Sequence, residues 1–202
     1  MSELNVSSAG TDAALGQYLL DNNASRFTVR AFAGGMLAAM GHSPTIAIRD
    51  FSGVVNFDPA HLDPGRAERA ALRMEIRADS LEVTDDIKRA DRTEMESTMC
   101  AKVLETARYP AITFESAGAA VESLGEGRYR VTVTGKLSLH GVTRSLPLTT
   151  QMTITGGMLR ASGDFSILQS DYGIARARVA GGALKLKDEL KFAFDIVARK
   201  QG

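Results

Sequence analysis

Hydrophobic and polar residues alternate along most of the second half of the chain, and this period of two is typical of β-strands with one buried face. The longest such segment runs from Arg128 to His140, and similar segments follow at residues 145–154, 159–167 and 190–197. Short turn signals separate them, namely Gly125-Glu126-Gly127, His140-Gly141-Val142-Thr143 and Gly156-Gly157. Consecutive strands joined by such turns predict an antiparallel meander.

The first half contains four further segments of the same kind, at residues 27–33, 45–58, 70–81 and 111–121. The whole chain therefore predicts about eight strands, several of them longer than the usual five or six residues. Gly53 lies inside the second of these segments and predicts a bulge or a sharp bend there.

One segment between the third and fourth strands departs from this pattern. From Asp85 to Thr106 the apolar residues Met95, Met99, Val103 and Leu104 recur at helical spacing. We expect a helix that ends before the proline that follows this segment.

Long antiparallel strands with one apolar face either close into a barrel or pack against a second sheet. Sequential hairpins, a single helix able to cover one end, and glycines in mid-strand at Gly135 and Gly163 favour the barrel, because barrel strands bend. The sequence therefore predicts an all-β fold, an eight-stranded antiparallel barrel, with a sandwich as the rival. The interior of such a barrel is filled by side chains or holds one small ligand.

Composition narrows the class of protein without indicating a function. The 202 residues suit one domain, and we expect an N-terminal arm over 1–24 followed by the barrel domain over 25–202. Lys and Arg together number 24, as do Asp and Glu, so the charge balance gives no reason to expect nucleic acid as a partner. The single cysteine, Cys100, excludes an intrachain disulfide and is expected to be a buried, inert thiol.

The sequence contains no apolar run of the roughly 18 residues that a membrane-spanning helix needs, so no integral membrane segment is expected. Residues 1–24 contain no basic residue and no secretory signal pattern. We therefore expect a cytoplasmic location. The sequence leaves open whether two barrels form a homodimer through an edge or an apolar barrel mouth.

Several longer motifs resemble those of a known family. They are FSGVVNFD at 51–58, ARYPAITFES at 107–116, VTGKLSLHGVTRSLPL at 133–148, ILQSDYGI at 167–174 and ELKFAFDIVAR at 189–199. With these motifs, which span about residues 26–199, the chain resembles the YceI family of lipid- or polyisoprenoid-binding domains. The resemblance implies an extended, lipocalin-like barrel whose apolar interior encloses an isoprenoid chain, such as a polyprenyl or quinone tail.

The alternation identifies the side chains expected to line that interior. They are Tyr129, Val131, Val133, Leu137, Leu148, Met152, Phe165, Phe192 and Phe194. Burial of each CH₂ group of a lipid tail would contribute roughly 0.8 kcal/mol without precise polar recognition. The leading hypothesis is a non-enzymatic binding protein that carries, stores or sequesters an isoprenoid or another long apolar lipid. The alternative is a structural or stress-related interaction protein whose barrel is filled by Phe27, Phe51, Phe57 and Phe114.

Polar candidates are few, and none predicts catalysis. No Ser lies in a G-x-S-x-G motif, so we interpret Ser170 and Asp171 as turn-forming residues. His42, His61 and His140 lack the spacing of a metal site, and His140 is expected to bond turn backbone. We expect no metal and no cofactor other than a bound isoprenoid lipid.

A polar head group is the remaining ligand feature that the sequence addresses. Tyr172 and Arg176 are its candidate contacts. The basic residues that follow the SDYGI segment form either a solvated rim or a seat for that head group, and they are Arg176, Arg178, Lys185 and Lys187.

Overall fold

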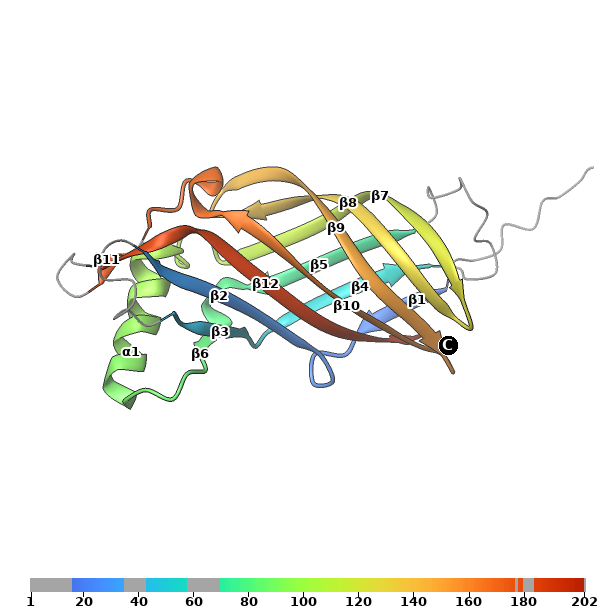
Figure 1. Ribbon diagram of the computed structural model, residues 1–202, viewed down its shortest axis with the longest axis horizontal. Coiled ribbons are helices and arrows are strands. Elements are labelled where there is room, and N and C mark those ends of the chain that lie inside the picture. Colours follow the sequence, from blue (N-terminus) through green and yellow to red (C-terminus); the bar gives the residue numbers. More distant parts are fainter. Residues whose placement is uncertain (1–15, 35–42, 58–69, 177, 180–183, 202) are drawn as a thin grey trace, which may run out of the picture.

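The alternating segments form long antiparallel strands that curl into a closed barrel (Figure 1). The computed structural model describes residues 16–34, 43–57, 70–176, 178–179 and 184–201. The first strands are β1 (Gln17–Leu20), β2 (Arg26–Gly34), β3 (Thr45–Ile48), β4 (Phe51–Asn56), β5 (Ala71–Arg77) and β6 (Leu81–Val83). The later strands are β7 (Ala111–Gly125), β8 (Arg128–Leu139), β9 (Val142–Thr155), β10 (Met158–Leu168), β11 (Arg178–Val179) and β12 (Leu184–Lys200).

The three earliest long strands are each interrupted once. β1 and β2 pair with the same edge of β12, while β1 also pairs with β4, and β2 with β3. In the same way, β4 pairs with β5, and β3 pairs with β6. Each of the pairs β1/β2, β3/β4 and β5/β6 therefore acts as one broken strand.

Counted in this way, eight strands form one ring. β7, β8, β9, β10 and β12 follow one another as antiparallel neighbours, and β12 closes the ring by pairing with β1 and β2. The predicted eight-stranded antiparallel barrel is confirmed. β1 lies within the segment expected to be an N-terminal arm, and its backbone is an integral barrel strand.

The predicted turns adopt the backbone conformation that their residues favour. His140 and Gly141 both have positive φ angles, 52° and 76°, and Gly156 and Gly157 have 57° and 78°. Such paired positive φ values match the right-handed twist of the flanking strands. These short connections keep β7 to β10 in sequential order around the ring.

One glycine expectation needs correction. The β4–β5 ladder continues through Gly53 without a register shift, and this strand instead breaks at residues 49–50. Gly53 makes room for a close neighbour, because a Cβ there would lie 2.8 Å from the Arg73 carbonyl oxygen and 3.0 Å from Leu20 Cδ2. Gly135 allows the Phe114 ring to lie against the backbone of β8, because a Cβ at this position would overlap Cζ of that ring.

The predicted helix is present and lies at one end of the barrel, beside β6 (Figure 1). It consists of α1 (Arg89–Thr98), continued by the π-helical turn η5 (Met99–Val103). Met95 and Met99 pack against apolar strand residues, yet no residue of α1 or η5 is fully buried. We call this the α1 end, and the opposite end, with the turns at 125–127 and 156–157, the hairpin end.

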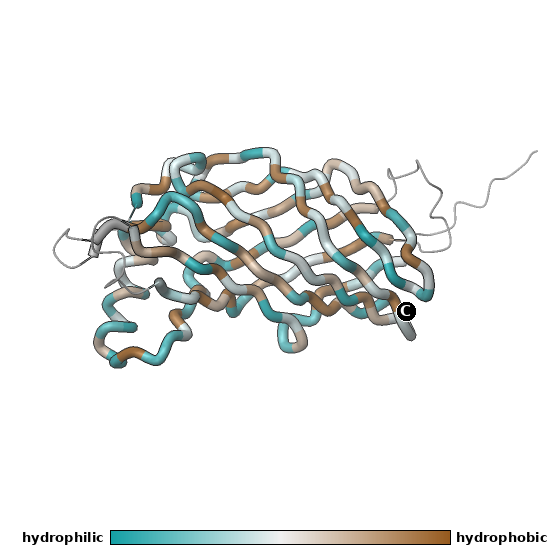
Figure 2. The backbone as a smooth tube through the Cα atoms, viewed as in Figure 1, coloured by the Kyte–Doolittle hydropathy of each residue, from teal (hydrophilic) through white to brown (hydrophobic). Residues whose placement is uncertain are grey.

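Hydropathy alternates along the barrel strands in three dimensions as it does in the sequence (Figure 2). On β8, for example, Val131, Val133 and Leu137 are buried, while Arg130 and Lys136 are exposed. The inward face of the ring is therefore apolar and the outward face is polar, as the period-two pattern requires.

Replacing Gly135 by alanine should destabilise the fold. The new methyl group would overlap the Phe114 ring and the Glu115 carbonyl oxygen, which lies 2.6 Å from the Cβ position. Overpacking of this kind costs about 1–3 kcal/mol. Gly118→Ala is the matched control, because nothing lies within 4 Å of its Cβ position. Urea unfolding should show a loss of stability for G135A only, and equal midpoints for both variants would contradict the Gly135–Phe114 packing.

Candidate functional site in the barrel interior

The interior of the barrel is built from two apolar clusters. The first contains buried residues from β1, β7, β8, β9 and β10, together with residues of the SDYGI segment. The second lies among β2, β3, β4, β5 and β6, and it includes Ile196 of β12. Gln169 is the only buried polar side chain among the described residues, so the described interior offers almost no polar recognition.

A belt of inward-facing side chains keeps partial exposure although the barrel is closed around it. Each belongs to or packs against one of the two clusters, and none is fully buried. We call this set the middle belt, and its members are Leu72, Met74, Leu146, Leu148, Phe165, Leu190, Phe192 and Phe194. A closed apolar ring whose inner side chains stay accessible is not packed to the density of an ordinary core.

One wall of this belt is aromatic. The rings of Phe165 and Phe192 are stacked with centroids 4.7 Å apart and an interplanar angle of 6°. Phe27 meets Phe51, Phe192 and other rings edge-on, at centroid distances of 6.2–6.4 Å. Edge-to-face and offset-stacked pairs each add about 0.5–1.5 kcal/mol to the contribution of buried area. The aromatic wall is therefore a rigid surface, and β5 and β9 contribute aliphatic side chains to the belt.

All nine side chains predicted to line the interior belong to the two clusters or pack against them. Val131, Val133, Leu137 and Met152 are fully buried. Tyr129 and the other four predicted residues, which belong to the middle belt, keep partial exposure. Their inward orientation is thus confirmed, while their contact with a ligand stays a prediction.

Sequence reasoning missed other members of the belt. Leu146 and Leu190 follow the same alternation as the chosen residues, so the signal for them was present. Leu72 and Met74 lie on β5, where alternation also predicts one buried face. Nothing in the sequence showed that side chains of β5 would line the same interior as those of β9 and β12.

The aromatic residues named in the self-filled alternative are all buried. Phe27, Phe51, Phe57 and Phe114 are 3–8% exposed. Phe57 contacts Tyr129 at the hairpin end, and Phe114 occupies the space left by Gly135. These rings fill parts of the interior but do not bury the middle belt.

Three of the longer sequence motifs meet at the α1 end around His140. Its Nδ1 lies 3.2 Å from the carbonyl oxygen of Tyr172, and its Nε2 lies 3.3 Å from Glu105 Oε2, in ion-pair range but without hydrogen-bond geometry. The ring of Tyr109 lies 4.6 Å from the imidazole, centroid to centroid. His140 was expected to bond the backbone of its own turn, and the structure corrects this, because its partner is the Tyr172 carbonyl oxygen in the SDYGI segment.

The same corner holds the SDYGI segment in place. Arg144 donates its Nε–H to the carbonyl oxygen of Asp171, at 2.9 Å. Gln169, in the 3-10 helix η6 (Gln169–Tyr172), donates to the carbonyl oxygen of Lys187, also at 2.9 Å. Ser170 binds the Asp188 carboxylate through its backbone N–H and its hydroxyl. These contacts account for the motif residues in structural terms.

The head-group candidates occupy different environments. Tyr172 is 3% exposed, and burial raises the pKa of its phenol above the usual range, with a further rise from the Asp171 carboxylate. Arg176 is exposed, and so is Lys187. The side chains of Arg178 and Lys185 lie outside what the structure describes, although their backbones are paired between β11 and β12.

No cluster of metal ligands occurs in the described part of the chain. Of the three histidines, His42 and His61 lie outside the described residues. Cys100 is partly buried, and burial is the main cause that raises the pKa of its thiol. Its thiolate is therefore disfavoured, in keeping with the expected unreactive thiol.

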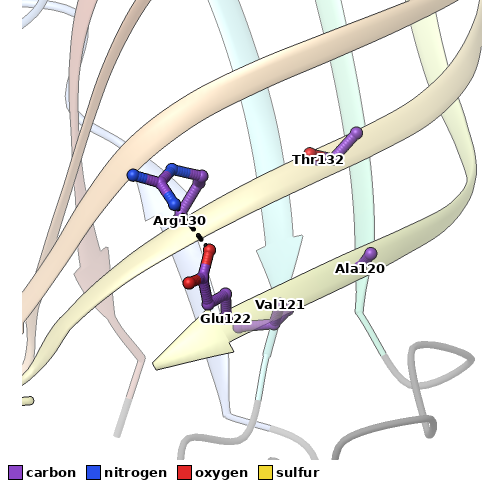
Figure 3. A pocket seen from close by; sticks show the side chains of 5 residues that line it. All are labelled: Ala120, Val121, Glu122, Arg130 and Thr132. Carbon is purple, nitrogen blue, oxygen red and sulfur yellow. Dashed lines mark hydrogen bonds and ion pairs between the residues drawn. The ribbon is translucent and has the colours of Figure 1, made fainter. Parts of the chain in front are cut away.

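A shallow hollow also lies on the barrel wall, over β7 and β8 (Figure 3). Ala120, Val121, Glu122, Arg130 and Thr132 line it. Arg130 Nη1 donates to Glu122 Oε2 at 2.7 Å, and both side chains are more than half exposed. The two charged side chains that line this hollow are thus paired with each other and exposed to solvent, and none of the predicted site residues lines it.

The fold and the interior together define an antiparallel barrel with a partly exposed apolar belt. The chain matches the YceI-like domain over residues 18–198 and therefore belongs to the YceI family. No curated protein matches it at a significant level. Among the residues described by the structure, no helix is long and apolar enough to cross a membrane.

Solved structures share the fold at low sequence identity. BcnA of Burkholderia cenocepacia has a TM-score of 0.66 at 22% identity, with 88% of this chain and 98% of that chain covered. A polyisoprenoid binding domain from Saccharophagus degradans, implicated in plant cell wall breakdown, has a TM-score of 0.66 at 17% identity, with coverage of 93% and 99%. The Campylobacter jejuni YceI protein has a TM-score of 0.59 at 17% identity, and both chains are covered completely.

Replacement of Gly141 by alanine should destabilise the His140 corner for two reasons. Its φ of +76° is strained for alanine, and the new Cβ would lie 2.6 Å from Tyr109 Cε1. Gly157→Ala has a similar φ of +78° but no contact shorter than 3.7 Å, so it isolates the cost of the backbone. We expect G141A to lose about 1–3 kcal/mol more than G157A in urea unfolding. Equal losses would show that Tyr109 does not pack tightly on this turn.

Proposed function

We propose that the barrel binds an isoprenoid, or another long apolar lipid, in its interior and carries, stores or sequesters it without catalysing a reaction. The middle belt is the observation that carries this proposal. Its apolar side chains face inward from β5, β9, β10 and β12 of a closed ring, and they stay partly exposed. Such side chains gain from an apolar ligand that replaces water beside them.

The ligand's chemical class follows from the composition of this surface. The belt contains Leu, Met and Phe side chains, and no charged side chain is fully buried among the described residues. A long hydrocarbon tail would gain roughly 0.8 kcal/mol for each buried CH₂ group and would require no polar partner inside. The polyisoprenoid-binding description of the Saccharophagus degradans domain supports the same class of ligand.

The self-filled barrel is the second candidate, and the burial of Phe27, Phe51, Phe57 and Phe114 favours it. Phe57 lies at the hairpin end, Phe27 and Phe51 belong to one wall, and Phe114 lies near the start of β7, so these rings leave Leu146, Leu148 and the other belt residues partly exposed. A barrel stabilised only by its own packing would bury those leucines as well. The lipid-binding function therefore accounts for more of the interior.

The polar residues of the α1 end support binding rather than catalysis. His140, Glu105 and Arg144 hold backbone and side chains of neighbouring segments. The Ser170 hydroxyl bonds Asp188 rather than a histidine. No nucleophile–base pair lies beside the described middle belt, so we assign the belt a binding role.

Native mass spectrometry of the purified protein, followed by organic extraction and lipid mass spectrometry, tests this function directly. We expect a co-purifying isoprenoid or other long-chain lipid at near-stoichiometric occupancy. A protein that stays at its apo mass when polyprenols and quinones are offered would favour the self-filled barrel.

A charge placed in the middle belt should abolish lipid binding or folding, because a buried unpaired charge costs several kcal/mol. Leu148→Arg and Phe194→Asp introduce such charges on the inward face. Thr149→Arg and Ala193→Asp place the same charges at exposed neighbouring positions and should leave lipid occupancy unchanged. Circular dichroism distinguishes loss of folding from loss of binding. Unchanged lipid occupancy in a folded L148R or F194D variant would contradict an interior site.

A further inference from the structure

The two ends of the barrel are covered in different ways. At the hairpin end, the covering side chains among the described residues belong to the barrel strands themselves or directly follow a strand. At the α1 end, they belong to α1, to η5 and to the SDYGI segment, which lie outside the strands of the ring. This difference bears on how a lipid lies inside the barrel.

Side chains from opposite sides of the ring meet at the hairpin end. Phe57, directly after β4, has its ring 6.0 Å from that of Tyr129 on β8. β4 and β8 are separated by β5 and β7 on one side and by four strands on the other, so this contact crosses the interior. The Phe57–Tyr129 pair therefore bridges the barrel.

Three more residues complete this closure. Met152 lies opposite Tyr129 in the β8–β9 ladder, and Leu159 lies opposite Ala198 in the β10–β12 ladder. Tyr18 and Leu159 are only 2% exposed, and Met152 is 5% exposed. We call Tyr18, Phe57, Tyr129, Met152 and Leu159 the stop cluster. Four of these residues are buried, in contrast to the partly exposed middle belt, and Tyr129 keeps partial exposure.

The cover of the α1 end is uneven, because Tyr172 and Ile174 of the SDYGI segment are 3% and 4% exposed whereas the helical segment is packed less closely. No residue of α1 or η5 is fully buried, and their apolar contacts come from Met95, Met99 and Val103. Arg144 and Gln169 also lie at this end, in bonds to the SDYGI segment and to β12. This end therefore offers more polar groups to a ligand head than the stop cluster, whose polar side-chain atoms are the hydroxyls of Tyr18 and Tyr129.

From these observations we infer that a bound lipid tail points toward the hairpin end, where the stop cluster limits its length, and that the polar head lies at the α1 end. This inference rests on the proposed lipid-binding function. Affinity then rises with each added isoprene unit until the tail reaches the stop cluster, and it falls for longer tails. Leu159 and Met152 are the specificity-determining residues, and Ala161, which lies opposite Met152 in the β9–β10 ladder, borders the same space.

Two substitutions should move this limit in opposite directions. Leu159→Ala removes bulk from the stop cluster and should allow a longer tail. Ala161→Leu adds bulk at a partly buried inward position next to Met152 and should shorten the preferred tail. Ile48→Ala is the matched control, because Ile48 is equally core-like at 5% exposure but belongs to the second cluster, away from the stop cluster.

The experiment measures binding of a series of linear prenols, from farnesol upward in single isoprene units, by competition in native mass spectrometry. We expect the preferred length to shift by about one unit, with at least about a tenfold change in relative affinity for the adjacent lengths. The limit should move to longer prenols in L159A, to shorter ones in A161L, and not at all in I48A. If L159A does not fold, A161L decides alone.

A length limit that stays fixed in both folded variants, or an affinity that keeps rising along the series in the wild type, would overturn the stop cluster. Absence of binding by any prenol would instead overturn the proposed function, and this inference with it. A prenol with a diazirine at its hydrocarbon terminus tests the direction of the tail. We expect crosslinks to peptides that contain the stop cluster, and crosslinks to α1 or η6 would reverse the orientation.

Discussion

The rest of the structure depends on the pairing of β12 along both of its edges. One edge pairs with β10, and the other pairs with β2 and then β1. The segment between β1 and β2 does not pair with β12 as a strand. Val197 of β12 makes two other hydrogen bonds there: its carbonyl oxygen accepts from the Asp21 N–H, and its N–H donates to Ser25 Oγ. The ring therefore closes without unpaired backbone at this point. Closure removes the exposed edges of an open sheet and encloses an interior.

An enclosed apolar interior must be filled by side chains, water or a ligand. Here the protein fills the hairpin end with the stop cluster and one wall with phenylalanine rings. Glycines admit two of these rings, since Gly135 accommodates Phe114 and Gly163 accommodates Phe194. The middle belt is left accessible, and this uneven filling is the physical basis of the proposed binding site.

The motifs of the YceI family have a structural explanation in this chain. The HG turn at 140–141, the Tyr109 ring and the SDYGI segment form one joint, in which Nδ1 of His140 lies within hydrogen-bond range of the Tyr172 carbonyl oxygen. This joint fixes the non-strand segments that cover the α1 end. The residues of the family motifs thus stabilise the segments at the α1 end of the barrel. The residues that would contact a lipid are ordinary apolar side chains.

Local sequence signals determined the strands, the turns, the single helix and the inward face of each strand, because periodicity and turn preferences act between near neighbours. All nine predicted interior residues accordingly face inward. Periodicity gives the face of a residue but not its height in the barrel, which depends on the register of every strand around the ring. Tertiary structure alone therefore decided that β1 closes the barrel and that Phe57 meets Tyr129 across it. The same long-range register decided which inward side chains are sealed and which stay accessible, because only closure brings residues from opposite strands together.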